Sequence, residues 1–356
     1  MHLNLIFIKP SIASNGGNQE IDFMISGFKN SSFKKVISLP LFPLNTSKFA
    51  SVFLFLFCYL KLIFRLRLFF SDYHIVLTHY STYPLVILRI FGPVSIFVQD
   101  MEWLFVTNRI LQNIIKICIM TSISISSRII FANKFLLNSF TNRYLLSGIS
   151  RKSFLYPVPS FPIDGYPSRR DRHQSVDETC ILVVAKPGNH KRFSDYVKLV
   201  RLLTSFPVKP PFKFRLTVIT PSELYRYFPC NSVVNVMPFQ SKKSFLFLLA
   251  NSHFFISLSP HEGFGINPLD SILCDCFPLL RYNGGCSNYL NLDFPGLLSR
   301  DSSVGDILNH LFRLDYMRRT TPNSFFSILD QAYDSCLQYL QNSLSLRDEF
   351  FRQFSD

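Results

Sequence analysis

The sequence is short of acidic residues and of paired cysteines, and each shortage excludes some classes of protein. Its 356 residues include 23 Asp and Glu against 37 Lys and Arg, which gives a formal net charge of +14. Such a charge indicates an anionic partner: a nucleic acid, a phosphorylated substrate or an anionic membrane. The eight cysteines have no paired spacing apart from Cys274 and Cys276, which argues against a zinc cluster and a disulfide framework. We therefore expect reduced thiols and a cytoplasmic protein.

Long uncharged apolar runs are also missing. The most apolar region is Phe49 to Phe70, but its uncharged part is only twelve residues, short of the ~20 that a spanning helix needs. Lys61, Arg65 and Arg67 then alternate with apolar residues. Two alternatives follow: a helix in a membrane interface with its cations near anionic lipid, or a buried helix with snorkelling basic ends. The N-terminus carries no charged segment followed by a cleavage site, so we expect no signal peptide.

The most informative stretch that is present is 257–270, Ser-Leu-Ser-Pro-His-Glu-Gly-Phe-Gly-Ile-Asn-Pro-Leu-Asp. An apolar run precedes it and helical spacing follows, so Glu262 lies in a strand-to-helix turn, where open α/β sheets bind ligands. Asp270 comes eight residues later, about two helical turns, and so shares a helix face with Glu262. Two such acids suit a ligand with hydroxyl groups at both ends, for example a sugar nucleotide. The alternative is a tight turn whose acid complements the helix dipole.

A second cluster is cationic. The apolar strand beginning at Thr179 ends in Lys186, and Lys191 and Arg192 follow just before an amphipathic helix. Cations at such a place form a pocket for a diphosphate, with Lys acting as a point charge and Arg as a fork. A purely structural role is less favourable, because cations at a helix N-terminus oppose the dipole.

A weaker signal lies near the N-terminus. Leu3 to Ile8 predicts a strand, which leads through Gly16 and Gly17 into a helix-like segment. A strand, a Gly-Gly turn and a helix form a geometry that approaches phosphates, although a plain loop is the alternative.

The residues His-Glu-Gly-Phe-Gly-Ile-Asn-Pro-Leu-Asp at 261–270 resemble the Glu-x7-Glu signature of the retaining glycosyltransferases of family 4. The resemblance implies an α/β protein of the GT-B fold, in which two Rossmann-like doubly wound domains face a central cleft. It implies that Glu262 contacts the donor sugar and that Asp270, where the family has Glu, contacts the nucleotide ribose. The turn residues expected beside the donor are Gly263, Phe264 and Gly265.

Two further elements extend the resemblance to the donor diphosphate. Lys186 and Lys191 resemble the cations of the family's Gly-Arg-x4-Lys element, with Lys186 standing where Arg is usual. They are expected to hold the diphosphate, with Arg192 beside them. In the resembled family a Gly-rich turn after the first strand faces the donor, which favours the same role for Gly16 and Gly17.

The acceptor side is less defined. Val-Gln-Asp-Met-Glu at 98–102 resembles the rhamnosyltransferase-like branch of the family. Many family members end this strand in a His near the acceptor, whereas Gln99 stands here and cannot shuttle a proton at neutral pH. This leaves Asp100 or Glu102 as an acceptor-side base, or no base at all, and the alternative for Asp100 is a helix N-cap. His79 ends the preceding strand, and we expect it to be buried for structural reasons.

The domain organisation follows from these segments. We expect an N-terminal Rossmann-like acceptor domain at 1–159 and a linker at 160–178, where Pro, Arg and Asp gather. A Rossmann-like nucleotide-sugar domain is expected at 179–323. The C-terminal helices at 324–356 follow, and by resemblance the last one crosses back to the first domain.

The resulting hypothesis is a retaining glycosyltransferase that moves a sugar from a nucleoside-diphosphate sugar to a glycan or lipid-linked acceptor. Its setting would be surface polysaccharide or lipopolysaccharide synthesis at the cytoplasmic face of a membrane, with Phe49 to Phe70 near anionic lipid. We expect no resident cofactor, and no metal because no Asp-x-Asp pair occurs. We also expect no nucleic acid, because no binding motif for it is present. The alternatives are a nucleotide-sugar epimerase of the same fold and a non-catalytic basic protein that binds membranes or nucleic acid.

Overall fold

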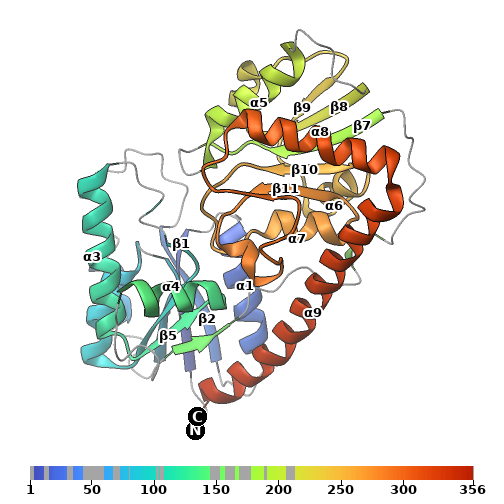
Figure 1. Cartoon of the computed structure of the whole chain (residues 1–356). Helices are drawn as coiled ribbons and strands as arrows, with labels where there is room; N and C mark the ends of the chain where they lie inside the picture. Colours follow the sequence, from blue (N-terminus) through green and yellow to red (C-terminus); the bar gives the residue numbers. More distant parts are fainter. Residues whose placement is uncertain are drawn as a thin grey trace. The chain divides into compact units, whose positions relative to one another are not determined.

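The fold is taken from a computed structural model, which places most of the chain in two separate units. It describes residues 4–11, 16–29, 35–42, 60–66, 73–79, 81–101, 104, 108–144, 153–156, 165–167, 178–187, 191–205 and 213–355. Unit 1 comprises Met1–Pro159 and Asn342–Asp356, and unit 2 comprises Ser160–Gln341. Figure 1 shows a sheet with flanking helices in each unit.

Unit 1 is built on a six-stranded parallel sheet in the order β2-β1-β3-β4-β5-β6. Its strands are β1 Asn4–Ser11, β2 Lys35–Phe42, β3 Tyr73–Leu77, β4 Val94–Val98, β5 Arg128–Phe131 and β6 Ser153–Leu155. Its helices are α1 Gly16–Lys29, the 3-10 helix η1 Tyr83–Phe91, α3 Arg109–Ile125 and α4 Lys134–Tyr144. The central strands are continuous apolar runs, such as the fully buried β4, because helices cover both faces of a parallel sheet.

The C-terminal helix α9, Pro322–Ser355, ends in unit 1. Its Phe350 and Phe351 rings lie 5.7 and 4.8 Å from the ring of Phe28 on α1, and Phe350 lies 5.0 Å from Tyr156. Edge-to-face aromatic pairs of this kind add to the free energy of area burial. The last turns of α9 are therefore part of the core of unit 1.

Unit 2 has a second parallel sheet, in the order β12-β11-β10-β7-β8-β9. Its strands are β7 Glu178–Val184, β8 Lys213–Ile219, β9 Val234–Met237, β10 Phe254–Ser257, β11 Phe277–Arg281 and β12 Leu297–Leu298. Its helical segments are α5 Phe193–Ser205, η6 Ser222–Tyr227, α6 Lys242–Ala250, α7 Ile266–Leu273, η7 Gly285–Asn288 and α8 Val304–Thr320. Helix α5 packs beside α8, and α6 packs beside α7 (Figure 1). The strand order reverses between β7 and β10, which is the doubly wound arrangement of dinucleotide-binding sheets.

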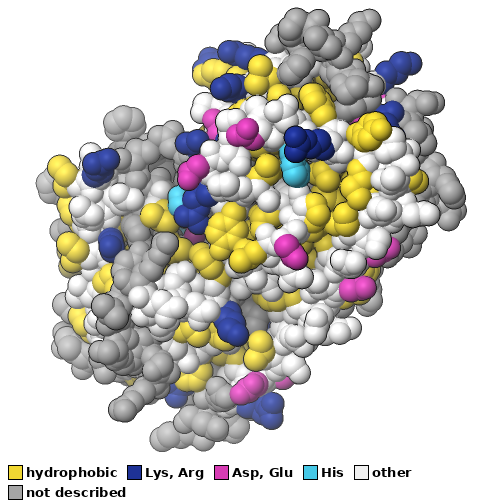
Figure 2. Space-filling view, viewed as in Figure 1, with side chains coloured by type: hydrophobic (Ala, Val, Ile, Leu, Met, Phe, Trp, Pro, Cys, Tyr) yellow, Lys and Arg dark blue, Asp and Glu magenta, His cyan; other side chains and the backbone are white. Residues whose placement is uncertain are grey.

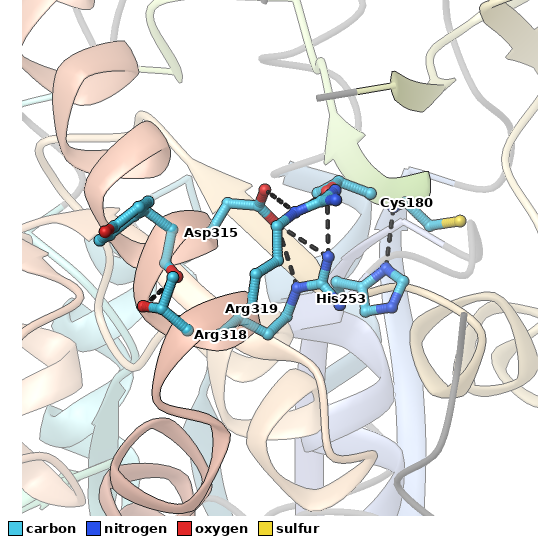
Figure 3. Close-up of polar contacts among 8 residues, drawn as sticks. Cys180, His253, Asp315, Arg318 and Arg319 are labelled. Carbon is cyan, nitrogen blue, oxygen red and sulfur yellow. Dashed lines mark hydrogen bonds and ion pairs between the residues drawn. The ribbon is translucent and has the colours of Figure 1, made fainter. Parts of the chain in front are cut away.

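A buried ionic network fixes α8 to the amino ends of the strands of unit 2 (Figure 3). The fully buried Asp315 pairs with Arg318 at 2.9 Å and with Arg319 at 2.7 Å, and it accepts a hydrogen bond from the Thr179 hydroxyl at 2.7 Å. Nearby, His253 Nδ1 accepts the backbone N–H of Cys180 at 2.9 Å. Because this network lies at the amino ends of β7 and β10, it leaves their carboxyl ends for a ligand.

The predicted segment Phe49 to Phe70 lies outside the described residues except for the helix 60–66. In this helix Leu62 and Leu66 are buried, whereas Leu60 and Phe64 are exposed. In the described part of the chain, no helix combines the length and apolar character needed to cross a bilayer.

Candidate functional site

The candidate site lies where the strand order of unit 2 reverses. Ala185 and Lys186 directly follow β7, and the turn 258–265 directly follows β10. These two strands are hydrogen-bonded neighbours whose connecting chains leave in opposite directions along the sheet. In open α/β sheets, ligands bind at this kind of switch point, outside the carboxyl ends of the strands.

Two of the predicted groups are in direct contact there. Lys191 Nζ lies 2.8 Å from Glu262 Oε1, and both side chains are partly exposed, at 21% and 26%. Lys186 is at the surface, yet its ammonium group is partly desolvated, with Nζ 5.9 Å from the ring centroid of Phe239. This desolvation, followed by the like charge on Lys191, lowers the pKa of Lys186, whereas Glu262 opposes the change. The cluster therefore holds two cations and one anion, an excess of positive charge suited to an anionic ligand.

The turn that carries Glu262 is held by the loop after β11. Glu262 forms an isolated parallel bridge with Gly284, and the Tyr289 hydroxyl donates a 2.6 Å hydrogen bond to the Gly265 carbonyl. Gly265 has a φ of +82°, and a Cβ there would lie 3.0 Å from that hydroxyl oxygen. A Cβ on Gly285 would lie only 2.6 Å from backbone atoms of Phe264. These glycines are thus required by packing between two loops, and this packing positions Glu262.

The first turn of α5 is fixed by a buried arginine. Arg281, at the end of β11, is 1% exposed, and its Nη1 lies 2.5 Å from Asp195 Oδ2. The same oxygen accepts a 3.1 Å hydrogen bond from Nε of Arg192, whose backbone has a φ of +55°. Asp195 therefore connects a buried cation to an exposed one. This connection holds the Arg192 side chain against the first turn of α5.

Asp270 occupies a different environment from Glu262. It is fully buried on α7, forms an ion pair with Lys242, and accepts a 2.8 Å hydrogen bond from the Tyr166 hydroxyl. Burial raises the pKa of Asp270, and Lys242 and Tyr166 oppose that rise. A ribose could reach this carboxylate only if Lys242 or Tyr166 moved.

Phe264 is likewise part of the protein interior. It is 4% exposed, and its ring centroid lies 5.5 Å from that of Tyr289 and 5.4 Å from that of Tyr339. A ligand beside Gly263 and Gly265 would therefore meet the backbone of this turn and not the phenyl ring of Phe264.

The predicted residues of unit 1 lie at the carboxyl ends of its strands. Gly16 and Gly17 begin α1, the helix that follows β1. Asp100 follows β4 and accepts the backbone N–H of Met101 at 2.8 Å. His79 follows β3; its Nδ1 lies 2.8 Å from the Ser81 hydroxyl, and burial lowers its pKa to about 4. The lowered pKa makes His79 neutral at pH 7, but its side chain is only partly buried, whereas the sequence predicted a buried one.

The solved structures that this chain resembles share its architecture over nearly their whole length. The structure of Anabaena HepE in complex with UDP and glucose matches with a TM-score of 0.72 and 13% identity, covering 99% of this chain and 100% of that one. Sucrose-phosphate synthase from Thermosynechococcus elongatus matches with a TM-score of 0.73, 10% identity and 99% of each chain. For trehalose-6-phosphate synthase from Burkholderia multivorans the values are 0.67, 12%, 100% and 99%. The chain has the GT-B fold. No family model and no curated protein matches the sequence.

Some residues that shape the site of this GT-B chain have no motif in the sequence. Asp195 and Arg281 are 86 positions apart, and Lys242 and Asp270 are 28 apart. The one available signal is Arg281 itself, a cation directly after the apolar run 277–280, where burial demands a partner. Among the residues that the structure describes, no cluster of three or more His, Cys, Asp or Glu that could hold a metal is found.

Proposed function

We propose that this GT-B chain is a retaining glycosyltransferase that uses a nucleoside-diphosphate sugar as donor. The observation that carries the proposal is the contact between Lys191 and Glu262, beside Lys186, at the switch point of unit 2. Three charged side chains from two turns converge where α/β sheets bind nucleotides. The resemblance of 261–270 to the family-4 signature supports the same assignment.

The cations act on the leaving group. During transfer the bond between the sugar C1 and the diphosphate oxygen breaks, and a bond forms between C1 and an acceptor hydroxyl oxygen, whose proton passes to an acceptor-side base that we assign to Asp100. Negative charge develops on the departing diphosphate, and Lys186 and Lys191 stabilise it as preorganised charges. Arg192 adds a planar donor group at the start of α5.

Glu262 orients the sugar. A carboxylate accepts hydrogen bonds from two sugar hydroxyl groups, and the bridge to Gly284 fixes its backbone. Glu262 also positions Lys191 through their ion pair. Donor binding would then give that lysine a second anionic partner. The predicted contact of Asp270 with a ribose stays a prediction that requires displacement of Lys242 or Tyr166.

The remaining assignments concern the acceptor and the setting. We assign unit 1 to a glycan or lipid-linked acceptor, with Asp100 as an acceptor-side base and Gly16 and Gly17 near the donor phosphates. Surface polysaccharide or lipopolysaccharide synthesis is the proposed pathway, with peripheral attachment to the membrane through Phe49 to Phe70. The attachment rests on the apolar and basic composition of Phe49 to Phe70, and the other assignments rest on the family-4 resemblance.

A panel of nucleotides tests the proposal directly. The structure of HepE contains UDP, so UDP and UDP-sugars come first, followed by the GDP, ADP and dTDP series. A ligand that binds only the folded state raises the midpoint of thermal unfolding. We expect one diphosphate series to do so without added metal. Release of that diphosphate from its sugar nucleotide, in the presence of crude lipid-linked glycan acceptors, then shows transfer.

The same panel separates the alternatives. An epimerase of the same fold would convert the nucleotide sugar into its isomer with no loss of the diphosphate. A non-catalytic basic protein would show no preference among nucleobases and no turnover, and this result would contradict the proposed function.

A further inference from the structure

Helix α3 of unit 1 is apolar on two opposite sides. Its inner side is buried through Ile119, Ser122 and Ile123, and the helix packs against η1. Its outer side carries large hydrophobic residues that remain exposed, namely Ile110 at 73%, Leu111 at 48%, Ile114 at 51%, Ile117 at 65% and Ile125 at 41%. We call these five residues the outer face of α3. At 100° per residue most of them point away from the buried side.

This concentration of exposed apolar residues is unusual for the described part of the chain. Fourteen large hydrophobic side chains are exposed there, and five of them lie on this one helix of 17 residues. Single exposed hydrophobic residues need no explanation, but a contiguous set marks an interaction surface. In Figure 1 α3 stands at one side of unit 1, and Figure 2 shows hydrophobic and cationic side chains interspersed along that edge.

The charges on α3 indicate what kind of surface it meets. The helix contains no acidic residue, and its cations are Arg109 and Lys116. Arg109 is exposed in the first turn, where it opposes the helix dipole and thus has no structural advantage. At about 1.5 Å per residue, α3 is roughly 25 Å long, with an apolar side and basic residues at its margin. These are the features of a helix that lies in the interface of an anionic membrane.

We propose that the outer face of α3 binds an anionic lipid surface. A second copy of the chain fits less well, because α3 has no acidic residue that could pair with the cations of another α3. The inference depends neither on the proposed glycosyl transfer nor on the segment Phe49 to Phe70. It adds a lipid-binding element formed by described residues.

The test compares two triple variants on vesicles of phosphatidylcholine with and without phosphatidylglycerol. The first carries Ile110→Gln, Ile114→Gln and Ile117→Gln. The matched control carries Leu292→Gln, Leu344→Gln and Leu346→Gln, which are exposed leucines elsewhere. We expect the parent and the control to sediment with anionic vesicles and the α3 variant to lose affinity at least about tenfold, because apolar burial drives interfacial binding. Unchanged UDP affinity and far-UV circular dichroism separate this loss from misfolding or from failure of the proposed function.

A label provides a second test that leaves the isoleucines intact. Cys118 is exposed on α3, and Cys230 is exposed in unit 2. The background carries Cys58→Ser and Cys180→Ser, because Cys180 is partly exposed and Cys58 lies outside the described residues. An environment-sensitive fluorophore is then placed on Cys118 with Cys230→Ser, or on Cys230 with Cys118→Ser. Anionic vesicles should shift the Cys118 emission to the blue and leave the Cys230 emission unchanged, and added salt should reverse the shift.

Three results would overturn the inference. The first is a parent protein that does not bind anionic vesicles, and the second is an α3 variant that binds them as the parent does. The third is a parent that is dimeric in analytical ultracentrifugation and an α3 variant that is monomeric but still binds vesicles. The outer face of α3 would then be a protein interface.

Discussion

At the scale of single residues, the account depends on charges that are shared between neighbours. Glu262 holds Lys191, and Asp195 holds both Arg192 and Arg281. Glu262 and Asp195 thus position Lys191 and Arg192, the two cations among these that we assign to the donor diphosphate. Removing a carboxylate should therefore affect binding and transfer in different ways.

Glu262→Gln separates these two effects. The change removes the charge with little change of shape, so sugar transfer should fall at least about a hundredfold, a loss typical of a removed transition-state contact. Affinity for the free nucleoside diphosphate should stay the same or rise, since Lys191 no longer pairs with a carboxylate. Calorimetry and the diphosphate-release assay measure the two quantities. Transfer within a few-fold of the parent would refute the sugar-orienting role.

Asp195→Asn tests the buried connection. Arg281 would keep its hydrogen bonds to the carbonyl groups of Ser302 and Leu258 but lose its counter-ion. We expect the free energy of unfolding to fall by roughly 2–3 kcal/mol, less than for a fully buried pair because Asp195 retains some solvent contact. Diphosphate affinity should fall as well. The control Arg192→Gln should weaken binding without loss of stability, since half of the Arg192 side chain is exposed. Equal stability of Asp195→Asn and the parent would exclude the positioning role.

At the scale of elements, the turn after β10 and the loop after β11 form one packed unit. Gly285→Ala would place a Cβ 2.6 Å from the backbone of Phe264 and push the Glu262 turn away. Overpacking of this kind costs roughly 1–3 kcal/mol, and transfer activity should fall with it. Gly305→Ala in α8 is the matched control: its nearest contact is 3.5 Å away, and helix propensity predicts a neutral or slightly stabilising effect. Denaturant titration measures the free energy of unfolding of both variants. If Gly285→Ala were as stable as Gly305→Ala, the packing between the two loops would not require a glycine at 285.

The elements predicted from the sequence are those with continuous apolar runs. The run 214–220 predicts a strand, and β8 spans Lys213–Ile219. Strand β2, Lys35–Phe42, was missed because it is an edge strand with a charged start and Pro40, so its pattern is mixed. The apolar segment that ends at Phe91, before a Gly-Pro turn, predicts a helix, and η1 is a 3-10 helix there.

The site was predictable only in part. Glu262, Lys186 and Lys191 follow apolar strands, and the carboxyl ends of parallel strands meet at one sheet edge. The partners Asp195, Arg281 and Lys242 could not be predicted, because their contacts depend on the strand order of unit 2. The burial of Asp270 has the same origin, since Tyr166 and Lys242 approach it from other elements.

At the scale of the whole molecule, both units hold histidines whose pKa is lowered by their surroundings: the buried His74 and the partly buried His79 in unit 1, and the partly buried His253 in unit 2. Burial, followed by the charge of Arg128, lowers the pKa of His74 in unit 1 to about 3. Burial, followed by the charge of Arg318, lowers that of His253 in unit 2 to about 4. Unfolding would return all three to about 6.5. The unfolded chain therefore binds more protons below pH 6.5, and stability is lost as the pH falls from 6.5 towards 4.

The predicted loss of stability at acidic pH is checked by measuring the free energy of unfolding as a function of pH. Each histidine should reduce the free energy of unfolding by on the order of 3 kcal/mol between pH 6.5 and pH 4. His74→Gln, which keeps a hydrogen-bonding group for Ser95, should flatten this dependence in denaturant titrations. A variant with the same slope as the parent would show that His74 does not cause the acid sensitivity.

The central claim is that the donor diphosphate binds at the carboxyl ends of β7 and β10, and calorimetry with UDP tests it most directly. Lys186→Ala and Lys191→Ala should each weaken binding by roughly 1.5–3 kcal/mol, the range for hydrogen bonds to charged groups. Lys243→Ala, an exposed lysine on α6, should bind UDP as the parent does. If the parent binds UDP and all three variants bind it equally well, the diphosphate lies elsewhere and the account is contradicted.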